Sequence, residues 1–140
     1  MNKKETGEKS KKLPFEVDRR SVYKCVQCGT CRSVCPVFDV VGWESANTRG
    51  RMLIIKSLIE GRPPSEDVLS SLASCTTCGI CAAKCPAGAN PPEVVEAARA
   101  QLVKCGVTTD AQEKLRTAVA TSGNSFGETR SRLHWLSDSE

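Results

Sequence analysis

Two copies of one cysteine pattern are the strongest chemical signal in the sequence, and they account for eight of its nine cysteines. Each copy reads C-x2-C-x2-C-x3-C-P with a glycine directly after the second cysteine, and the copies occupy residues 25–36 and 75–86. Three thiols spaced three residues apart in a tight loop can bind three irons of a cubane cluster, but the fourth iron needs a ligand from elsewhere. The pattern therefore predicts two [4Fe–4S] clusters.

The fourth cysteine of each copy is expected to complete the cluster of the other copy, as in two-cluster ferredoxins. One predicted ligand set is Cys25, Cys28, Cys31 and Cys85. The other is Cys75, Cys78, Cys81 and Cys35. The glycine inside each copy permits unusual backbone angles, and the proline after the fourth cysteine turns the chain away from the cluster.

Zinc and disulfides are the alternatives for a chain so rich in cysteine. Zinc sites use separated C-x2-C pairs and have no need of the third cysteine in each copy. The N-terminus is polar and basic, unlike a signal peptide, and no run approaches the roughly 18 apolar residues of a membrane span. We therefore expect a reducing, cytoplasmic compartment without membrane insertion, where thiols bind metal. A zinc-stabilised interaction module remains the alternative from another functional class.

The composition indicates neither nucleic-acid binding nor catalysis. The formal charge of +4 counts the cysteines as neutral. Eight thiolates and two cluster cores of about +2 each bring the loaded chain near zero, so no nucleic-acid partner is expected. No catalytic triad or phosphate loop is present, and we predict no catalytic residue. Aromatic residues make up only 4% of the chain, so bound metal is expected to help stabilise a thin core.

Helix signals fill the rest of the chain, and no segment alternates as a strand does. Between the repeats, one helix is expected to bury Met52, Ile55 and Ile59 and to end at Gly61. Ser65 is expected to cap a second helix, with the apolar stripe Val68, Leu69 and Leu72.

Two further helices are expected after the second repeat. Asn90 is predicted to cap a helix that begins at Pro91 and ends at Gly106, with the apolar face Val94, Val95, Ala98 and Leu102. Thr109 is expected to open a last helix whose inward residues are Leu115, Ala118 and Val119.

Four residues outside the cysteine pattern raise separate questions. Cations such as Arg49 and Arg51 are unfavourable at a helix N-terminus unless an anion lies close. The two side chains either lie in solvent at the helix start or face a cluster or a partner, and the sequence leaves both alternatives open. Cys105 is expected to pack as a small apolar residue rather than to act as a ligand. His134 lacks any metal-ligand spacing.

The chain resembles a family of heterodisulfide reductase proteins, which contains the separate ferredoxin-type subunit of that enzyme and the N-terminal ferredoxin half of its fused relatives. Iron–sulfur subunits of anaerobic glycerol-3-phosphate dehydrogenase, glycolate oxidase and lactate-utilisation proteins belong to the same family. The resemblance covers roughly residues 20–136 and rests on both cysteine runs and on residues 48–51, 85–88, 124–128 and 133–136. It implies a mainly α fold, the alpha-helical ferredoxin domain, with two [4Fe–4S] cluster loops.

Three regions are expected along the chain. Residues 1–13 form a flexible basic tail, residues 14–120 the alpha-helical ferredoxin domain, and residues 121–140 a C-terminal extension. The extension carries the apolar residues Phe126, Leu133, Trp135 and Leu136. We expect it to dock on a partner, with folding back onto its own helices as the alternative.

The resemblance implies an electron-transfer subunit within a heterodisulfide-reductase-like complex. Its expected partners are a flavin-bearing donor and an iron–sulfur subunit with C-C-G motifs, because this sequence contains no such motif. The alternative is the iron–sulfur subunit of a flavin-dependent 2-hydroxyacid or glycerol-3-phosphate dehydrogenase. The expected location is the cytoplasm, with any attachment to a membrane made through a partner.

Overall fold

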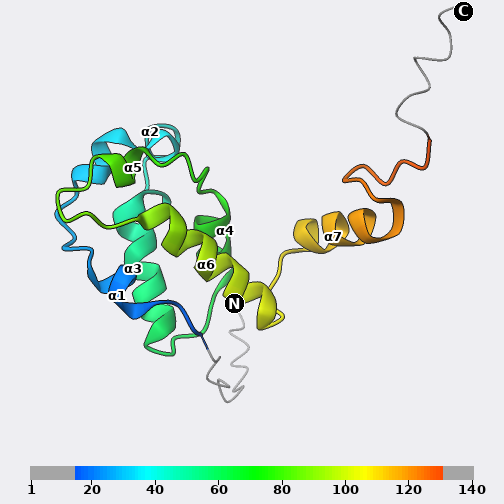
Figure 1. The fold of residues 1–140 in the computed structure, drawn as a ribbon, viewed down its shortest axis with the longest axis horizontal. Helices are drawn as coiled ribbons and strands as arrows, with labels where there is room; N and C mark the ends of the chain where they lie inside the picture. The colour runs from blue at the N-terminus through cyan, green and yellow to red at the C-terminus, as the bar shows by residue number, and fades with distance from the viewer. Residues whose placement is uncertain (1–14, 131–140) are drawn as a thin grey trace, which may run out of the picture. The chain divides into compact units, whose positions relative to one another are not determined.

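The computed structural model describes residues 15–130, whose regular elements are all helices joined by loops, with no strand (Figure 1). In chain order the elements are α1 Arg19–Tyr23, the 3₁₀ helix η1 Thr30–Val34, α2 Pro36–Val41, the 3₁₀ helix η2 Glu44–Ala46, α3 Thr48–Ile59, α4 Glu66–Ala73, α5 Ile80–Ala83, α6 Pro91–Lys104 and α7 Asp110–Ser122. The prediction of a mainly α fold is confirmed.

The chain divides into two compact units, the first ending at Val107 and the second beginning at Thr108. The first unit contains both cysteine runs and the helices α1 to α6, and the second contains α7. The expected boundaries at residues 13 and 120 stay a prediction, because the first falls among residues outside the described part of the chain and the second falls inside α7.

Helix α3 is the centre of the first unit, where it contacts α1, α4, α6, η1 and η2. Its predicted apolar face is confirmed, since Met52, Ile55 and Ile59 are buried, and Leu58 is buried as well. The core is completed by α4 and α6, which contribute the buried residues Leu72, Val94, Val95, Ala98 and Leu102. Most of this unit's apolar burial therefore depends on faces that meet α3.

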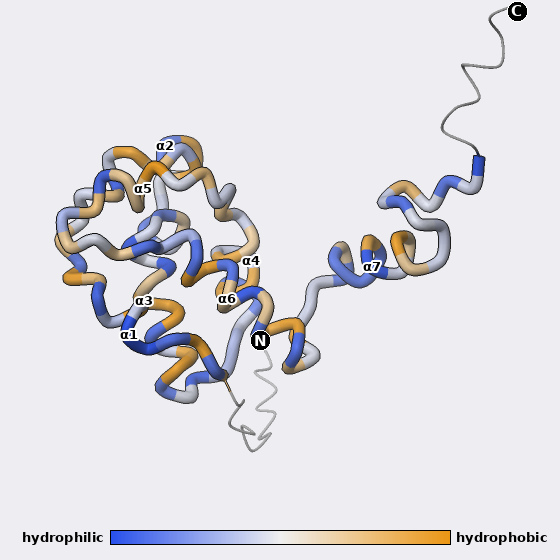
Figure 2. The backbone as a smooth tube through the Cα atoms, viewed as in Figure 1, coloured by the Kyte–Doolittle hydropathy of each residue, from blue (hydrophilic) through white to orange (hydrophobic). Residues whose placement is uncertain are grey.

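Hydrophobic and hydrophilic residues alternate in short runs along α3, α4 and α6, as expected of helices with one buried face (Figure 2). Among residues 15–130, no helix combines the length and the apolar content that crossing a bilayer requires.

Helix starts follow their local capping signals, with one exception. The Ser65 side chain accepts a hydrogen bond from the amide of Val68, as predicted for the start of α4. At α7, Thr109 and Gln112 form a reciprocal capping box. Asn90 does precede α6, but its side chain makes no capping bond and instead donates to Glu93 at 2.9 Å. Asn90 therefore occupies the predicted N-cap position without the capping bond, because the second helical residue, Pro92, has no N–H to donate and the amide group turns to the nearby carboxylate.

The inward face predicted for α7 is not covered by the described residues of its own unit. Leu115 and Val119 are 50% and 49% exposed, and no residue of this helix is buried. Phe126, which follows the helix, is 85% exposed. The apolar spacing predicted the helix correctly, but periodicity does not decide whether another element covers its apolar face.

The core of the first unit can be tested with two substitutions on α3. Ile55 is fully buried, whereas Leu53 on the same helix is 41% exposed. Ile55→Ala should lower the free energy of unfolding by about 2–5 kcal/mol, because it removes buried methyl groups and leaves a cavity. Leu53→Ala should lower it by well under half as much. Chemical denaturation of the cluster-loaded chain measures both, and equal losses would contradict the core described above.

Candidate metal centre

The two cysteine runs fold into loops with the same backbone turns. Gln27 and Thr77, which occupy equivalent positions before the second cysteine, have φ angles of +60° and +51°. The glycines after the second cysteine, Gly29 and Gly79, have φ angles of +87° and +82°. Positive φ is uncommon for residues other than glycine, and unusual for a β-branched residue such as Thr77. The sequence repeat is therefore a structural repeat, and both loops carry the same strained turn.

The first cavity lies against the loop of residues 25–31 and has about 370 Å³ of empty space. Its lining includes the thiols of Cys25, Cys28, Cys31, Cys81 and Cys85. Four of these are one predicted ligand set, and Cys85 comes from the other run. Most of the remaining lining is apolar or backbone, from residues such as Val26, Pro86, Ala87 and Pro91.

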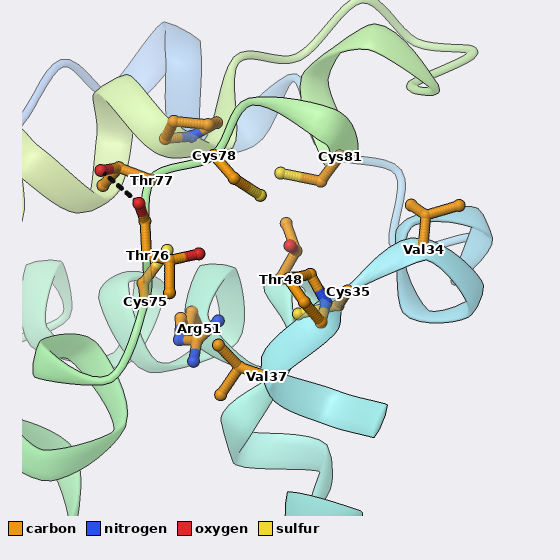
Figure 3. Close-up of a pocket in the computed structure, with 12 residues that line it drawn as sticks. Val34, Cys35, Val37, Thr48, Arg51, Cys75, Thr76, Thr77, Cys78 and Cys81 are labelled. Atoms are coloured by element: carbon orange, nitrogen blue, oxygen red, sulfur yellow. Dashed lines mark hydrogen bonds between the residues drawn. The ribbon is translucent and has the colours of Figure 1, made fainter. Parts of the chain in front are cut away.

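The second cavity lies against the loop of residues 75–81 and has about 300 Å³ of empty space. Four thiols line it, namely Cys35, Cys75, Cys78 and Cys81. Figure 3 shows the sulfur atoms of Cys78 and Cys81 directed toward one shared space, with Thr48 and Arg51 of α3 beside it.

The first turn of α3 lies between the two cavities. Thr48 and Cys81 line both of them, so they mark the shortest separation of the two sites. Thr48 is buried, and its side chain lies within hydrogen-bonding reach of Cys81. Thr48 was not among the predicted site residues, although its place in the motif of residues 48–51 was a signal that could have identified it.

The electrostatic environment of the thiols repeats between the loops. A hydrogen bond from the Thr30 hydroxyl lowers the pKa of Cys28, and a backbone hydrogen bond from Ile80 lowers the pKa of Cys78. Burial raises the pKa of Cys31, as do the neighbouring thiolates of Cys25 and Cys81. Thiolate is the metal-binding form, so Cys28 and Cys78, whose pKa values are lowered, are more readily available as ligands. The thiolate of Cys31 is disfavoured by burial, and a bound metal cation would stabilise it.

The fourth cysteine of each run is held by a backbone contact. The amide of Ala89 donates to the Cys85 sulfur at 3.3 Å, and Cys35, which is buried, points its thiol toward the carbonyl of Ala46 at 3.9 Å. Amides that donate to ligand sulfurs stabilise their anionic form and orient them.

The two arginines noted in the sequence have different surroundings. Arg49 lines the first cavity and forms a 2.6 Å ion pair with Glu44, with the two side chains 30% and 42% exposed. Arg51 lines the second cavity and is 1% exposed, so the solvated interpretation is wrong for it. Both guanidinium groups thus face a cysteine-lined space.

Arg99 of α6 secures the approach to the second run. Its guanidinium donates to the carbonyls of Leu72, Ala73 and Cys75 at 2.6–2.9 Å. These carbonyls close α4 and continue into the loop, and a cation at a helix C-terminus is favourable. Arg99 was not predicted to have a role. It follows Ala98, at the border of the predicted apolar face of α6, and from this position its side chain can reach the end of α4.

The residues present fit a pair of iron–sulfur clusters. Each cavity gathers at least four thiols, and each fourth thiol arrives from the distant run. Soft thiolate ligands suit iron–sulfur clusters, and the apolar lining limits water access, which tunes such sites.

Other residues noted in the sequence lie away from both cavities or outside the described part. Cys105 is half-buried at the C-terminal end of α6 and lines neither cavity. His134, Leu133, Trp135 and Leu136 lie outside residues 15–130, so the docking of the C-terminal extension stays a prediction.

The family comparison identifies the segment that carries both loops. Residues 21–89 match the 4Fe-4S dicluster domain. A dicluster domain implies two 4Fe–4S clusters, and the cofactor prediction is confirmed. No solved structure is significantly similar to the chain.

Curated relatives come from several oxidoreductases. The chain is 38% identical over 64 residues to the glycolate oxidase iron-sulfur subunit of Escherichia coli, an alignment that covers 46% of the chain and 16% of that protein. It is 34% identical to a dihydromethanophenazine:CoB–CoM heterodisulfide reductase subunit of Methanosarcina barkeri, covering 59% of the chain and 24% of that protein. It is 33% identical to a CoB–CoM heterodisulfide reductase iron-sulfur subunit of Methanopyrus kandleri, covering 74% of the chain and 51% of that protein.

The chain thus spans about half of the Methanopyrus kandleri relative and less of the others. The predicted resemblance to the heterodisulfide reductase and glycolate oxidase subunits is confirmed, and both the favoured assembly and its alternative are represented among the relatives.

The contribution of Arg99 can be tested by Arg99→Met, which keeps the length of the side chain. The variant should lose about 2 kcal/mol or more of unfolding free energy, because charge-assisted bonds to three carbonyls disappear. Arg116→Met is the matched control, since Arg116 is an exposed residue of α7 that pairs with Glu113. Denaturation should find the control nearly unchanged, and an equally small effect of Arg99→Met would show that the carbonyls need no such partner.

Proposed function

Since residues 21–89 match the 4Fe-4S dicluster domain, we propose that the chain is an electron-transfer subunit of a heterodisulfide-reductase-like complex. The observation that carries this proposal is the pair of adjacent thiol-lined cavities joined by Thr48 and Cys81. Two neighbouring cluster sites with no catalytic constellation between them are what a relay requires. When bound, the clusters supply reversible one-electron transfer.

The proposed ligands follow the crossed pattern. Cys25, Cys28 and Cys31 bind one cluster together with Cys85. Cys75, Cys78 and Cys81 bind the other together with Cys35. The lining of the two cavities supports this assignment, because each contains the fourth cysteine of the other run. Cys81 borders both cavities, and its place in the loop of residues 75–81 assigns it to the second.

The chain's own residues hold the two sites close together and partly dry. The buried first turn of α3 separates them by little more than one side chain, Thr48. Cys28 and Cys78 are exposed, so each site has one edge at the surface. An entry edge and an exit edge joined by a short internal step are the elements of an electron relay.

The proposed partners are a flavin-bearing donor subunit and a C-C-G-type iron–sulfur subunit, in the cytoplasm. Names of the relatives support assembly with other protein subunits, as in heterodisulfide reductase. The glycolate oxidase relatives support the second candidate, the iron–sulfur subunit of a flavin-dependent 2-hydroxyacid dehydrogenase. In both assemblies, this chain carries electrons away from a flavin.

The ligand assignment predicts a crossed response to substitution. The reconstituted chain should contain about eight iron and eight sulfide, as two [4Fe–4S] clusters require. Cys35→Ser should alter the electron paramagnetic resonance signal of the same cluster that Cys78→Ser alters, because both cysteines line the second cavity.

Cys105→Ser is the control for this experiment and should leave iron content and both signals unchanged. A Cys35→Ser variant that alters the signal of the Cys28 cluster would overturn the crossed assignment. Iron content near zero after reconstitution, with zinc in its place, would overturn the cluster function itself.

The relay predicts a defined donor. Anaerobic purification from the native source should recover this chain with a flavin-bearing subunit, detected by the fluorescence of the released flavin. Addition of the donor's substrate should bleach the cluster absorbance of this chain within the complex. A C-C-G-type subunit in the same complex supports the heterodisulfide-reductase-like assembly. A 2-hydroxyacid dehydrogenase in its place supports the second candidate. Clusters that stay oxidised would contradict both assemblies.

A further inference from the structure

Arg51 is a buried cation whose hydrogen-bond acceptors are all neutral. Its side chain is 1% exposed. The other large side chains that are fully buried among the described residues are uncharged. Its Nε donates to the carbonyl of Ser71 at 2.8 Å, and its Nη2 donates to the hydroxyl of Ser74 at 2.9 Å. These bonds orient the guanidinium but do not neutralise its charge.

No carboxylate compensates this charge within residues 15–130. The ion pairs in that part of the chain are Arg49–Glu44 and Arg116–Glu113, and neither includes Arg51. An unpaired ion taken out of water costs several kcal/mol even after relaxation of its surroundings. A buried arginine therefore needs an anion that the protein's side chains do not provide.

The end of α4 supplies part of the missing negative charge, but it is shared. Arg51 contacts the last turn of this helix at Ser71 and Ser74, while Arg99 contacts it at Leu72 and Ala73. A helix C-terminus is equivalent to about half a negative charge. Two guanidinium groups at one helix end therefore leave an excess of more than one positive charge. The electric field of this excess charge acts on the groups next to the helix end.

The second cavity lies beside them, and its chemistry matches this excess. Arg51 lines that cavity together with its four thiols, as Figure 3 shows. Four thiolates around an oxidised core of about +2 carry a net charge of about −2, so a bound cluster is an anion. We propose that Arg51 is the buried counter-cation of the cluster in the second cavity and raises its reduction potential relative to the first. The inference rests on the proposed cluster function and goes beyond it.

The first cavity has a cation as well, but that cation is paired with a carboxylate. Arg49 lines it, but its Nε lies 2.6 Å from a Glu44 carboxylate oxygen, so the pair is neutral overall. Both partners are also partly exposed, and water screens the remaining field. The cysteine repeat makes the two ligand loops alike, whereas α3 gives the second site a dry, uncompensated cation. Because an added electron makes a cluster more negative, the nearby cation stabilises the reduced form more than the oxidised one.

The test is a redox titration of the reconstituted chain, followed by electron paramagnetic resonance. Arg51→Gln removes the charge and keeps a donor for the Ser71 carbonyl. It should shift the reduction equilibrium of one cluster toward the oxidised form by tenfold or more, about 59 mV for a one-electron couple. Arg51→Lys keeps the charge, so its reduction potential should stay close to that of the wild-type chain. The affected signal should be the one that Cys78→Ser alters.

The double variant Glu44→Gln, Arg49→Gln is the matched control, because it removes a neutral ion pair from the first cavity. It should shift either equilibrium by less than twofold. Equal shifts from the control and from Arg51→Gln, or an Arg51→Gln chain with both clusters and unchanged potentials, would overturn the inference. Neither result affects the relay, which is tested separately by the cluster content of the wild-type chain and by reduction of its clusters within the native complex.

A second variant covers the case in which Arg51→Gln does not load both clusters. Ser74→Asp leaves Arg51 in place and puts a carboxylate where its Nη2 now contacts a hydroxyl. The new ion pair should shift the same cluster toward the oxidised form. Ser74→Asp combined with Arg51→Lys should also shift this cluster toward the oxidised form. A Ser74→Asp chain with unchanged potentials would overturn the inference.

Discussion

The first turn of α3 must fit between two cysteine loops, and the rest of the domain depends on that fit. Asn47 caps the helix by accepting from the amide of Gly50, and Thr48 reaches both cavities. Gly50 is buried against the backbone of Glu44, where a Cβ atom would overlap the Glu44 carbonyl. A glycine inside a helix costs about 1 kcal/mol relative to alanine, and here the close approach of η2 explains it. The motif of residues 48–51 is thus a packing device that holds two sites together.

Polar links supplement a small apolar core. Arg51 from α3 and Arg99 from α6 both bind the C-terminal end of α4, which leads into the second cysteine run. The position of Cys75 consequently depends on hydrogen bonds from two helices far apart in sequence. Under the proposed ligand assignment, bound metal would complete this arrangement, because thiols from both runs would connect segments that few apolar contacts join.

The internal repeat and its surroundings have separate functions. The two loops share their ligand spacing and their backbone turns, which suits two clusters of the same type. The elements around the loops differ, with an exposed neutral ion pair at one cavity and a buried cation at the other. Under the proposed role of Arg51, two clusters of one type would lie in unequal fields, which would favour the electron on one of them. Relatives from different oxidoreductases are consistent with a relay module whose specificity comes from its partners.

The sequence by itself determined the clusters, the helices and most of their ends. The eight thiols repeat at a spacing that few other sites need, and Ser65 and Thr109 cap their helices through bonds within one turn, so these features are local. Only the tertiary structure decided what each helix face meets. The same apolar spacing is buried in α3 and exposed in α7, and of two arginines two residues apart one is paired near the surface and the other is buried. Burial and charge compensation depend on neighbours distant in sequence, and no local pattern contains them.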